Sequence, residues 1–383
     1  MGVAMIAIVF WASIALIVWT HVAYGAAIAA VARMRRRAIA AADMLPRVLI
    51  VVAAYNEAAV IERRLENLLA LDYPADRLAI VVSSDASTDA TNDLVARIAE
   101  REPRVHLLVN ERGGKIQAQD KAVRAFGSDV DVLAFSDANC TWAPDALRLL
   151  VRPLADPEVG YVCGRLAILD ADGVNKEGAY WRYEMWLRAN ESAVGSVTGG
   201  NGSIYAVRRS AYIEVHPSMG HDLSFPCRMV QNGLRAVYEP AAVASEKPSK
   251  DTEEEYRRKV RMFEHCWLIV LRGKMLRRLP PLYWLAIVSH RHLRYLTGLL
   301  HLVALAANIA LVVLEPGSAL YWLTLAGQGG LLALALLGKA RIRVPFAGLA
   351  WYYTLVSWAT TKALFNYLRR GVPATWEAAE GTR

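Results

Sequence analysis

The sequence predicts an α/β domain with a mixed, mostly parallel sheet and with transmembrane helices at both ends. Three observations predict this class. Between residues 46 and 250, short hydrophobic strands alternate with amphipathic helices, as in βαβ units. Long apolar runs lie before and after this region. The 383 residues are 55% hydrophobic, which is more than an ordinary soluble domain contains.

The first segment, residues 1–32, is predicted to be a membrane anchor. Its apolar run from Met5 to Ala32 is longer than the ~20 helical residues that cross a bilayer. Because no basic leader precedes this run, we expect an uncleaved anchor and not a signal peptide. Four arginines lie between residues 33 and 37, and the positive-inside rule places them in the cytoplasm, with the N-terminus outside.

The α/β region begins after this basic cluster. Strands are expected at residues 48–53, 78–83, 105–109 and 130–135, and helices at 58–71, 88–99 and 115–126. A strand-pair element is expected at 160–169, followed by an aromatic-rich helix at 176–192 and a glycine-dense run at 198–205.

The strand at 130–135 leads into two oxygen ligands, Asp137 and Asn139. In α/β sheets, ligands collect beyond the carboxyl ends of the strands. Two hard oxygen donors there suit Mg²⁺ or Mn²⁺ carrying a phosphorylated substrate. Taken alone, the motif also fits a polar turn that only closes the strand.

Two further strands end in the same way. The first is followed by Tyr55-Asn56-Glu57, which alone could be an N-cap with an acidic first helical turn. The next ends at Asp85, before a Ser/Thr/Asp cap. Carboxylates at neighbouring strand ends, together with Asp137, form a stronger indication of a binding site than any one of these turns.

Charge and cysteine content exclude several classes of protein. The net charge is +8, but the basic residues cluster beside apolar runs, which favours contact with membrane lipids and not with nucleic acid. The four cysteines show no CxxC spacing, so neither a zinc site nor a disulfide framework is indicated.

The C-terminal part is predicted to return to the membrane. Residues 251–290 are expected to form interfacial amphipathic helices, although a plain surface helix at 251–278 fits equally well. Residues 291–370 are expected to hold about three transmembrane helices, at 295–314, 319–337 and 345–368. Three crossings would place Arg369 and Arg370 outside, so either the charge rule fails or one segment does not cross.

Taken together, the motifs make the chain resemble a membrane-anchored family 2 glycosyltransferase with the GT-A fold, similar to polysaccharide synthases. The resemblance covers about residues 46–274. Its motifs are, in order, Tyr55-Asn56-Glu57, Asp85-x-Ser-x-Asp89, Gly113-Gly-Lys115, Asp137-x-Asn139, Gly199-Gly-Asn-Gly202 and Gly220-His-Asp222. It implies that residues 46–250 form a cytoplasmic GT-A domain at the inner (plasma) membrane.

The resemblance also implies roles for individual residues. The donor, a nucleotide sugar, would be bound by Tyr55, Glu57, Asp85, Lys115, Asp137, Arg258 and Arg261. Asp137 and Asn139 would hold the Mg²⁺ or Mn²⁺ ion, with Asn139 standing where the family usually has a second aspartate. Asp222 would be the general base, although it also fits an ordinary acidic residue at a helix N-terminus. Glu184 and Glu191 are the next candidates for the base.

The resemblance predicts an inverting hexosyl- or N-acetylhexosaminyltransferase. Its donor would be a nucleotide sugar, with UDP expected, and its acceptor a lipid-linked glycan or a polysaccharide of the bacterial envelope or exopolysaccharide. Processive relatives carry a Gln-x-x-Arg-Trp motif where this chain has residues 258–262, and the Gln and Trp are missing. A processive polysaccharide synthase of the same fold is the first alternative. A membrane scaffold with an inactive domain is the second.

Overall fold

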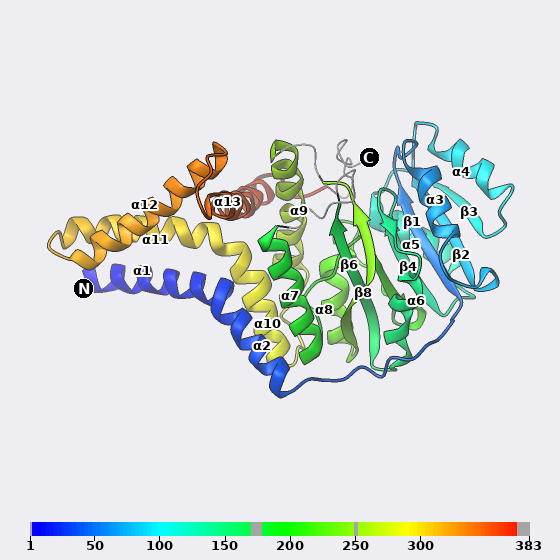
Figure 1. The fold of residues 1–383 in the computed structure, drawn as a ribbon, viewed down its shortest axis with the longest axis horizontal. Coiled ribbons are helices and arrows are strands. Elements are labelled where there is room, and N and C mark those ends of the chain that lie inside the picture. Colours follow the sequence, from blue (N-terminus) through cyan, green and yellow to red (C-terminus); the bar gives the residue numbers. More distant parts are fainter. Residues whose placement is uncertain (1, 170–177, 249–251, 374–383) are drawn as a thin grey trace.

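The computed structural model describes residues 2–169, 178–248 and 252–373, and its centre is one mixed sheet (Figure 1). The strands, in sheet order, are β3 (Val105–Asn110), β2 (Leu78–Asp85), β1 (Val48–Ala54), β4 (Val132–Asp137), β7 (Tyr205–Arg208), β6 (Val159–Ile168), β8 (Arg235–Glu246) and β5 (Thr141–Trp142).

The first four strands of the sheet are parallel, and β7 runs antiparallel to both of its neighbours, β4 and β6. The predicted mixed, mostly parallel α/β fold is confirmed. Because β2, β1 and β4 are adjacent and parallel, their carboxyl ends lie side by side at the same end of the sheet. In this register Ala53 of β1 lies opposite Asp137 of β4.

Both faces of the sheet are covered by helices, which explains why the parallel strands are continuously apolar. Residues Val48, Ile50 and Val52 of β1 pack into one core, and Leu49 and Val51 pack into the other. The first core includes α3 (Ile61–Leu69) and α6 (Ala146–Val151), with α4 (Thr91–Ala99) on the same side. The second includes α5 (Lys115–Phe126), α7 (Ala179–Val194) and α8 (His221–Gln231).

Most expected elements of this region are present within a few residues. One differs: the strand pair expected at 160–169 is a single strand, β6, because its partners β7 and β8 come from later in the chain. Residues 176–177 of the expected aromatic helix, and Asp251 of the helix expected at 251–278, lie outside the described residues.

Three helical segments of the described chain are long and apolar enough to cross a membrane. The first consists of α1 (Gly2–Val18), the π-helical turn η1 (Trp19–Ala23) and α2 (Tyr24–Met34). The second consists of α10 (Pro281–Ile287), the π-helical turn η5 (Val288–Leu293) and α11 (Arg294–Leu314), and the third is α12 (Ala319–Lys339). Figure 1 shows α1, α11 and α12 extending away from the sheet, whereas α2 and α10 bend back beside α7.

The segment expected as the last span, residues 345–368, forms α13 (Ala347–Arg370), which is not among these three segments. In Figure 1 α13 is seen nearly end-on, so it runs across α1 and α11. It packs against α12 and α9 (Thr252–Arg272). If the other three segments cross, Arg369 and Arg370 fall on the same side as the arginines at 33–37. The conflict with the charge rule then disappears.

The apolar part of α9 is covered by protein. Trp267, Leu268, Ile269 and Val270 are buried in a cluster that includes residues of α13. The indole N–H of Trp267 donates to the carbonyl oxygen of Thr360 in α13, at 2.9 Å. The residues expected to face the membrane surface therefore pack against α13.

Candidate active site

The turns after β1 and β2 are joined by hydrogen bonds. The side-chain oxygen of Asn56 accepts from the backbone N–H of Thr88 at 2.8 Å, and the N–H of Glu57 donates to the hydroxyl of Thr91 at 2.8 Å. Asn56 has φ 53°, a left-handed conformation that asparagine tolerates better than most residues. Asn56 therefore shapes the turn that places Tyr55 and Glu57 at the edge of the sheet.

Asp85 fixes the loop that precedes α5. Its carboxylate, 4% exposed, accepts from the backbone N–H groups of Gly113 at 2.7 Å and Gly114 at 2.9 Å. It also pairs with the guanidinium of Arg112 at 2.9 Å, and that guanidinium lies 3.2 Å from the ring centroid of Tyr55. The three side chains form one wall of the site, in which the Arg112 guanidinium lies between the Tyr55 ring and the Asp85 carboxylate.

Lys115, the first residue of α5, points at the end of β4. Its ammonium forms an ion pair with the carboxylate of Asp137. Burial alone would lower the pKa of Lys115, but the charge and hydrogen bond of Asp137, with Asp222 and Glu246 nearby, raise it above its usual range. The lysine is therefore a cation held at the strand edge, as a diphosphate site requires.

A second carboxylate, Glu246 at the end of β8, lies beside Asp137. The Ser203 hydroxyl is 3.1 Å from a carboxylate oxygen of Asp137 and forms a close hydrogen bond with Glu246. Burial, and next the charge of Asp137, raise the pKa of Glu246. One hydroxyl hydrogen cannot satisfy both carboxylates at once, so the pair is suited to a further cation.

This pair fits Mg²⁺ or Mn²⁺ only with help from a ligand. The described ranges contain no group of three or more His, Cys, Asp or Glu residues that could hold a metal ion. Magnesium, however, is usually held by one or two carboxylates together with substrate phosphates and water. Asn139 lines the same cavity. Gly202 of the glycine-rich loop also lies next to these residues. A Cβ added to Gly202 would be 3.2 Å from the Lys115 nitrogen and 3.6 Å from a carboxylate oxygen of Asp137, so glycine leaves room there for a ligand.

Asp222 lies in the first turn of α8, where the helix dipole favours a carboxylate. It is half-buried and accepts from the N–H of Leu223 at 3.0 Å. The adjacent His221 is 3% exposed, bonds to Tyr205 at 2.7 Å and stacks on Phe225. Burial and the nearby Lys115 lower the pKa of His221 to about 3. His221 is therefore a buried, neutral side chain, and both His221 and Asp222 line the cavity.

All sequence-predicted site residues line one cavity of about 1750 Å³. They are Tyr55, Glu57, Asp85, Lys115, Asp137, Asn139, Asp222, Arg258 and Arg261. Arg258 also pairs with Glu255 at 2.9 Å. The same cavity continues between α9, α11 and α13, where Ile269, Tyr295, Leu349 and Val356 line it. It thus joins a charged end at the sheet to an end beside α9, α11 and α13 that contains these apolar residues and is here called the apolar end, although Glu264, Arg291 and Arg370 also line it.

The aromatic helix α7 lines the cavity with Tyr180, Trp181, Glu184 and Arg188, and most of these side chains are also held by contacts within the protein. The indole N–H of Trp181 donates to the carbonyl oxygen of Leu166 at 3.0 Å, and Tyr180 lies against the guanidinium of Arg294. The two ring nitrogens of His290 lie within ion-pair distance of Glu184 and Glu191, respectively. Burial alone would raise the pKa of Glu184, but Arg294 and His290 hold it well below its usual range. Both glutamates are therefore poorly suited to be the general base.

Three residues of the site were not singled out in the sequence. Arg112 stands just before the Gly113-Gly114-Lys115 motif, Ser203 lies within the glycine-dense run, and Glu246 ends a strand. A carboxylate at a strand end was the signal that pointed to Asp85 and Asp137, and it would also have found Glu246. Nothing in the spacing of Arg112 or Ser203 shows that they face these carboxylates.

Comparison with protein families agrees with this geometry. Residues 49–215 match the model described as glycosyl transferase family 2. Residues 135–363, more than half of the chain, match the model for glycosyl transferase family group 2. The chain belongs to glycosyltransferase family 2. Its fold is GT-A, as the arrangement of the sheet and the site indicates.

A solved structure similar to this family 2 glycosyltransferase is the mannosyltransferase PcManGT from Pyrobaculum calidifontis, in complex with GDP-Man and Mn²⁺. The TM-score is 0.71 at 26% sequence identity, and the match covers 94% of this chain and 99% of that one. The similarity therefore extends beyond the sheet to the helices at both ends.

Curated relatives match over shorter stretches. A probable glycosyltransferase, YdaM of Bacillus subtilis, is 25% identical over 60% of this chain and 57% of its own length. The β-monoglucosyldiacylglycerol synthase of Synechocystis is 32% identical over 42% and 33%. The poly-β-1,6-N-acetyl-D-glucosamine synthase of Staphylococcus aureus is 24% identical over 52% and 50%. The chain spans between a third and somewhat more than half of the length of these relatives.

Proposed function

We propose that this protein is an inverting glycosyltransferase that moves one sugar from a nucleoside-diphosphate sugar to a lipid-bearing acceptor at the cytoplasmic face of the plasma membrane. The observation that carries the proposal is the single cavity that joins the Lys115–Asp137 end to the apolar end between α9, α11 and α13. Such a cavity can hold a charged donor and an amphiphilic acceptor together.

The donor is proposed to occupy the charged end. The Arg112 guanidinium and the Tyr55 ring on which it lies form one side of the pocket for the base and ribose, and Asp85 holds Arg112 in place together with the loop at 113–114. Lys115 contacts the diphosphate, and Arg258 and Arg261 contribute positive charge from α9. Both UDP, the nucleotide expected from the sequence, and GDP, the nucleotide in PcManGT, are to be compared by calorimetry.

Asp137 and Glu246 are proposed to hold Mg²⁺ or Mn²⁺ together with the diphosphate, with Asn139 as an additional oxygen ligand. When bound, the ion neutralises the negative charge that develops on the departing nucleoside diphosphate. Lys115 stabilises the same charge directly. Asp222 takes the proton from the acceptor hydroxyl as that oxygen attacks the anomeric carbon, which inverts its configuration.

The acceptor class is tested with two acceptors that share a head group but differ in the presence of an alkyl chain. Each buried CH₂ contributes about 0.8 kcal/mol, so four buried groups raise kcat/KM by roughly 100-fold. We expect the purified protein, given a panel of labelled nucleotide sugars, to prefer the alkylated acceptor by at least this factor.

Mass analysis should show one sugar added, since Met262 stands where processive relatives have Trp. Equal use of both acceptors contradicts a lipid acceptor, and long product ladders favour the synthase alternative.

A tryptophan at Gly348 is expected to obstruct the apolar end. Gly348 lines the cavity in α13, and a Cβ added there meets no atom within 4 Å, so the substitution needs no rearrangement of the fold. We expect Gly348→Trp to raise the KM for the alkylated acceptor about tenfold, the equivalent of one or two CH₂ groups left unburied. Gly327→Trp in α12 is the control, since Gly327 is equally open but does not line the cavity. Equal effects of the two substitutions on acceptor KM would rule out this path.

A further inference from the structure

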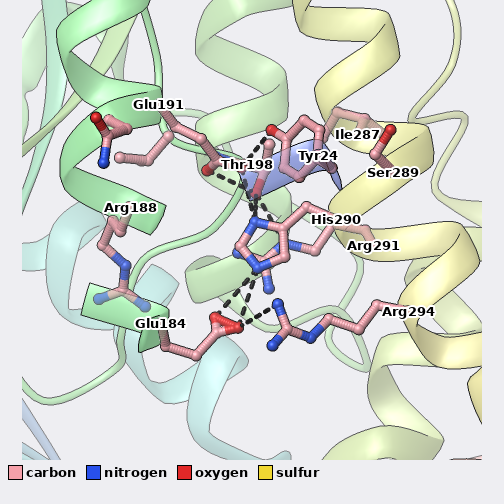
Figure 2. A network of polar contacts seen from close by, with 12 residues as sticks. Tyr24, Glu184, Arg188, Glu191, Thr198, Ile287, Ser289, His290, Arg291 and Arg294 are labelled. Carbon is pink, nitrogen blue, oxygen red and sulfur yellow. Dashed lines mark hydrogen bonds and ion pairs between the residues drawn. The ribbon is translucent and has the colours of Figure 1, made fainter. Parts of the chain in front are cut away.

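A buried polar network joins the membrane helices to the glycine-rich loop of the active site (Figure 2). Its members are Tyr24 of α2, Glu184, Arg188 and Glu191 of α7, Thr198 at the start of the loop, His290 and Arg291 of η5, and Arg294 of α11. Three stretches that are far apart in the sequence, at residue 24, at 184–198 and at 290–294, thus meet at one point.

Thr198 is the point where the loop is held. Its side chain is fully buried, and its hydroxyl accepts from the Arg291 Nε–H at 3.0 Å. Its backbone N–H and its hydroxyl both lie 3.0 Å from one carboxylate oxygen of Glu191 and donate to it. The His290 ring nitrogen Nδ1 is also 3.0 Å from the hydroxyl. Hydrogen bonds to charged partners are about twice as strong as neutral ones, so this residue is firmly fixed.

His290 carries the network from the loop into the membrane helices. Its Nδ1 lies 2.7 Å from Glu191 and its Nε2 lies 3.1 Å from Glu184, and the side chain is 1% exposed. The Tyr24 hydroxyl donates to Glu191 at 2.8 Å, and Arg294 pairs with Glu184 at 2.9 Å. Buried charges of this kind persist only where each has a partner, so every member restricts the positions of the others.

The glycine-rich loop connects this network to Asp222. A Cβ added at Gly199 would lie 2.6 Å from an Nη atom of Arg291, so the loop backbone packs directly on the guanidinium. The next residue, Gly200, donates its N–H to the backbone carbonyl of Asp222 at 2.6 Å, and its own carbonyl accepts from Arg188 at 3.0 Å. A continuous chain of contacts therefore runs from Arg291 to the backbone of Asp222.

Two π-helical turns hold this junction together. In η1, Thr20 donates its hydroxyl hydrogen to the backbone carbonyl of Ser289 at 2.6 Å, and the Trp19 indole N–H donates to the Ser289 hydroxyl at 2.9 Å. Ser289 belongs to η5, whose wide turn lets the neighbours His290 and Arg291 both reach Thr198. Such turns within α-helices are frequent at functional sites.

We propose that His290 and Arg291, which belong to a membrane helix, are positioning residues for sugar transfer. They fix Thr198 and the glycine-rich loop, and the loop backbone in turn sets Asp222 against the acceptor hydroxyl. The proposal rests on the role of Asp222 in the proposed function. Its effect falls on the transfer step, since the contacts at the donor end are made by the turns at 55–57 and 112–115.

The test removes the hydroxyl at the centre of the network. Thr198→Val keeps the shape of the side chain, but the new side chain can neither accept from Arg291 nor donate to Glu191; the backbone N–H bond to Glu191 stays. Thr198→Ser keeps the hydroxyl. In full-length protein in lipid nanodiscs, we expect Thr198→Val to lower kcat by about tenfold or more, because hydrogen bonds to charged groups are lost. The KM for the donor and the affinity for the nucleoside diphosphate should change less than about twofold. Thr198→Ser should restore kcat.

Thr324→Val is the matched control, because Thr324 in α12 also carries a hydrogen-bonded hydroxyl but lies outside the network. A readout that needs no activity is hydrogen exchange of residues 199–203, which should become faster in Thr198→Val and stay unchanged in the control. Wild-type kcat in Thr198→Val, or an equal loss of donor affinity, overturns the inference. If the wild-type protein transfers no sugar, the proposed function fails, and unchanged exchange in Thr198→Val would then overturn the positioning role separately.

Discussion

Replacement of Asp222 by asparagine is expected to lower kcat by about 10²–10⁴-fold, the usual contribution of a general base. Asparagine keeps the size of the side chain and one oxygen acceptor for the N–H of Leu223, so α8 should remain in place. It cannot take the proton of the acceptor hydroxyl. Steady-state kinetics with saturating donor and acceptor measure the effect, and calorimetry should show nucleoside-diphosphate affinity within about twofold of wild type.

Asp85→Asn serves as the comparison for Asp222→Asn, because it should show the opposite pattern. The Asp85 carboxylate holds Arg112 and the N–H groups of Gly113 and Gly114, so its loss loosens the donor end and weakens nucleotide binding. Near-normal turnover of Asp222→Asn would place the base elsewhere. Glu184 and Glu191 would then be tested, although their ion pairs with His290 and Arg294 argue against them.

Removal of the metal is expected to have an effect of similar size. EDTA should abolish transfer, and Mg²⁺ or Mn²⁺ should restore it, since a Lewis acid contributes several kcal/mol, or about 10³-fold in rate. Asp137→Ala should behave like the chelated enzyme. Glu246→Gln should require more metal for half-maximal activity, because it removes one charge next to Asp137.

A binding measurement separates loss of metal from loss of activity. Paramagnetic resonance of Mn²⁺ in the presence of nucleoside diphosphate should show weakened binding in Asp137→Ala and Glu246→Gln. Asp129→Ala, which removes an exposed carboxylate before the start of β4, at the opposite end of that strand from Asp137, should leave Mn²⁺ binding unchanged. Full transfer in excess chelator would show that the Asp137 site needs no divalent ion, with Lys115 left as its cation.

The fold was largely predictable because its signals are local. A strand such as β1, buried on both faces, must be apolar throughout. A helix such as α5, buried on one face, must have apolar residues every three or four positions. The last apolar segment shows what this reasoning leaves open. α13 contains polar residues such as Tyr352, Lys362 and Asn366 and is not one of the three segments long and apolar enough to cross a membrane, and its apolar residues pack against α9 and α12. Apolar length alone does not distinguish a lipid-facing helix from one that packs on protein.

The site was only partly predictable for a related reason. Asp85, Asp137 and Asp222 were found because each follows a strand or opens a helix next to glycine or serine residues. Glu246 shares the strand-end position but stands more than a hundred residues from Asp137, and the antiparallel pairing of β5 with β8, in which Thr141 lies opposite Ser245, brings it near. The same holds for Thr198 and His290, whose contact joins residues 92 positions apart. Long-range contacts of this kind depend on the tertiary packing, so no pattern of residue spacing in the sequence predicts them.

In the proposed function, the adjoining turns η1 and η5 would also set how far above the bilayer the transfer takes place. The first two of the three candidate membrane segments bend at these turns, and hydrogen bonds from Thr20 and Trp19 to Ser289 join the two bends. The proposed base, Asp222, would then be held at one height above the lipid. A membrane-embedded acceptor would have to bring its hydroxyl to that height, so the junction would select acceptors by the length of their head group. Acceptors whose head groups are too short or too long would bind through their tails and still not react.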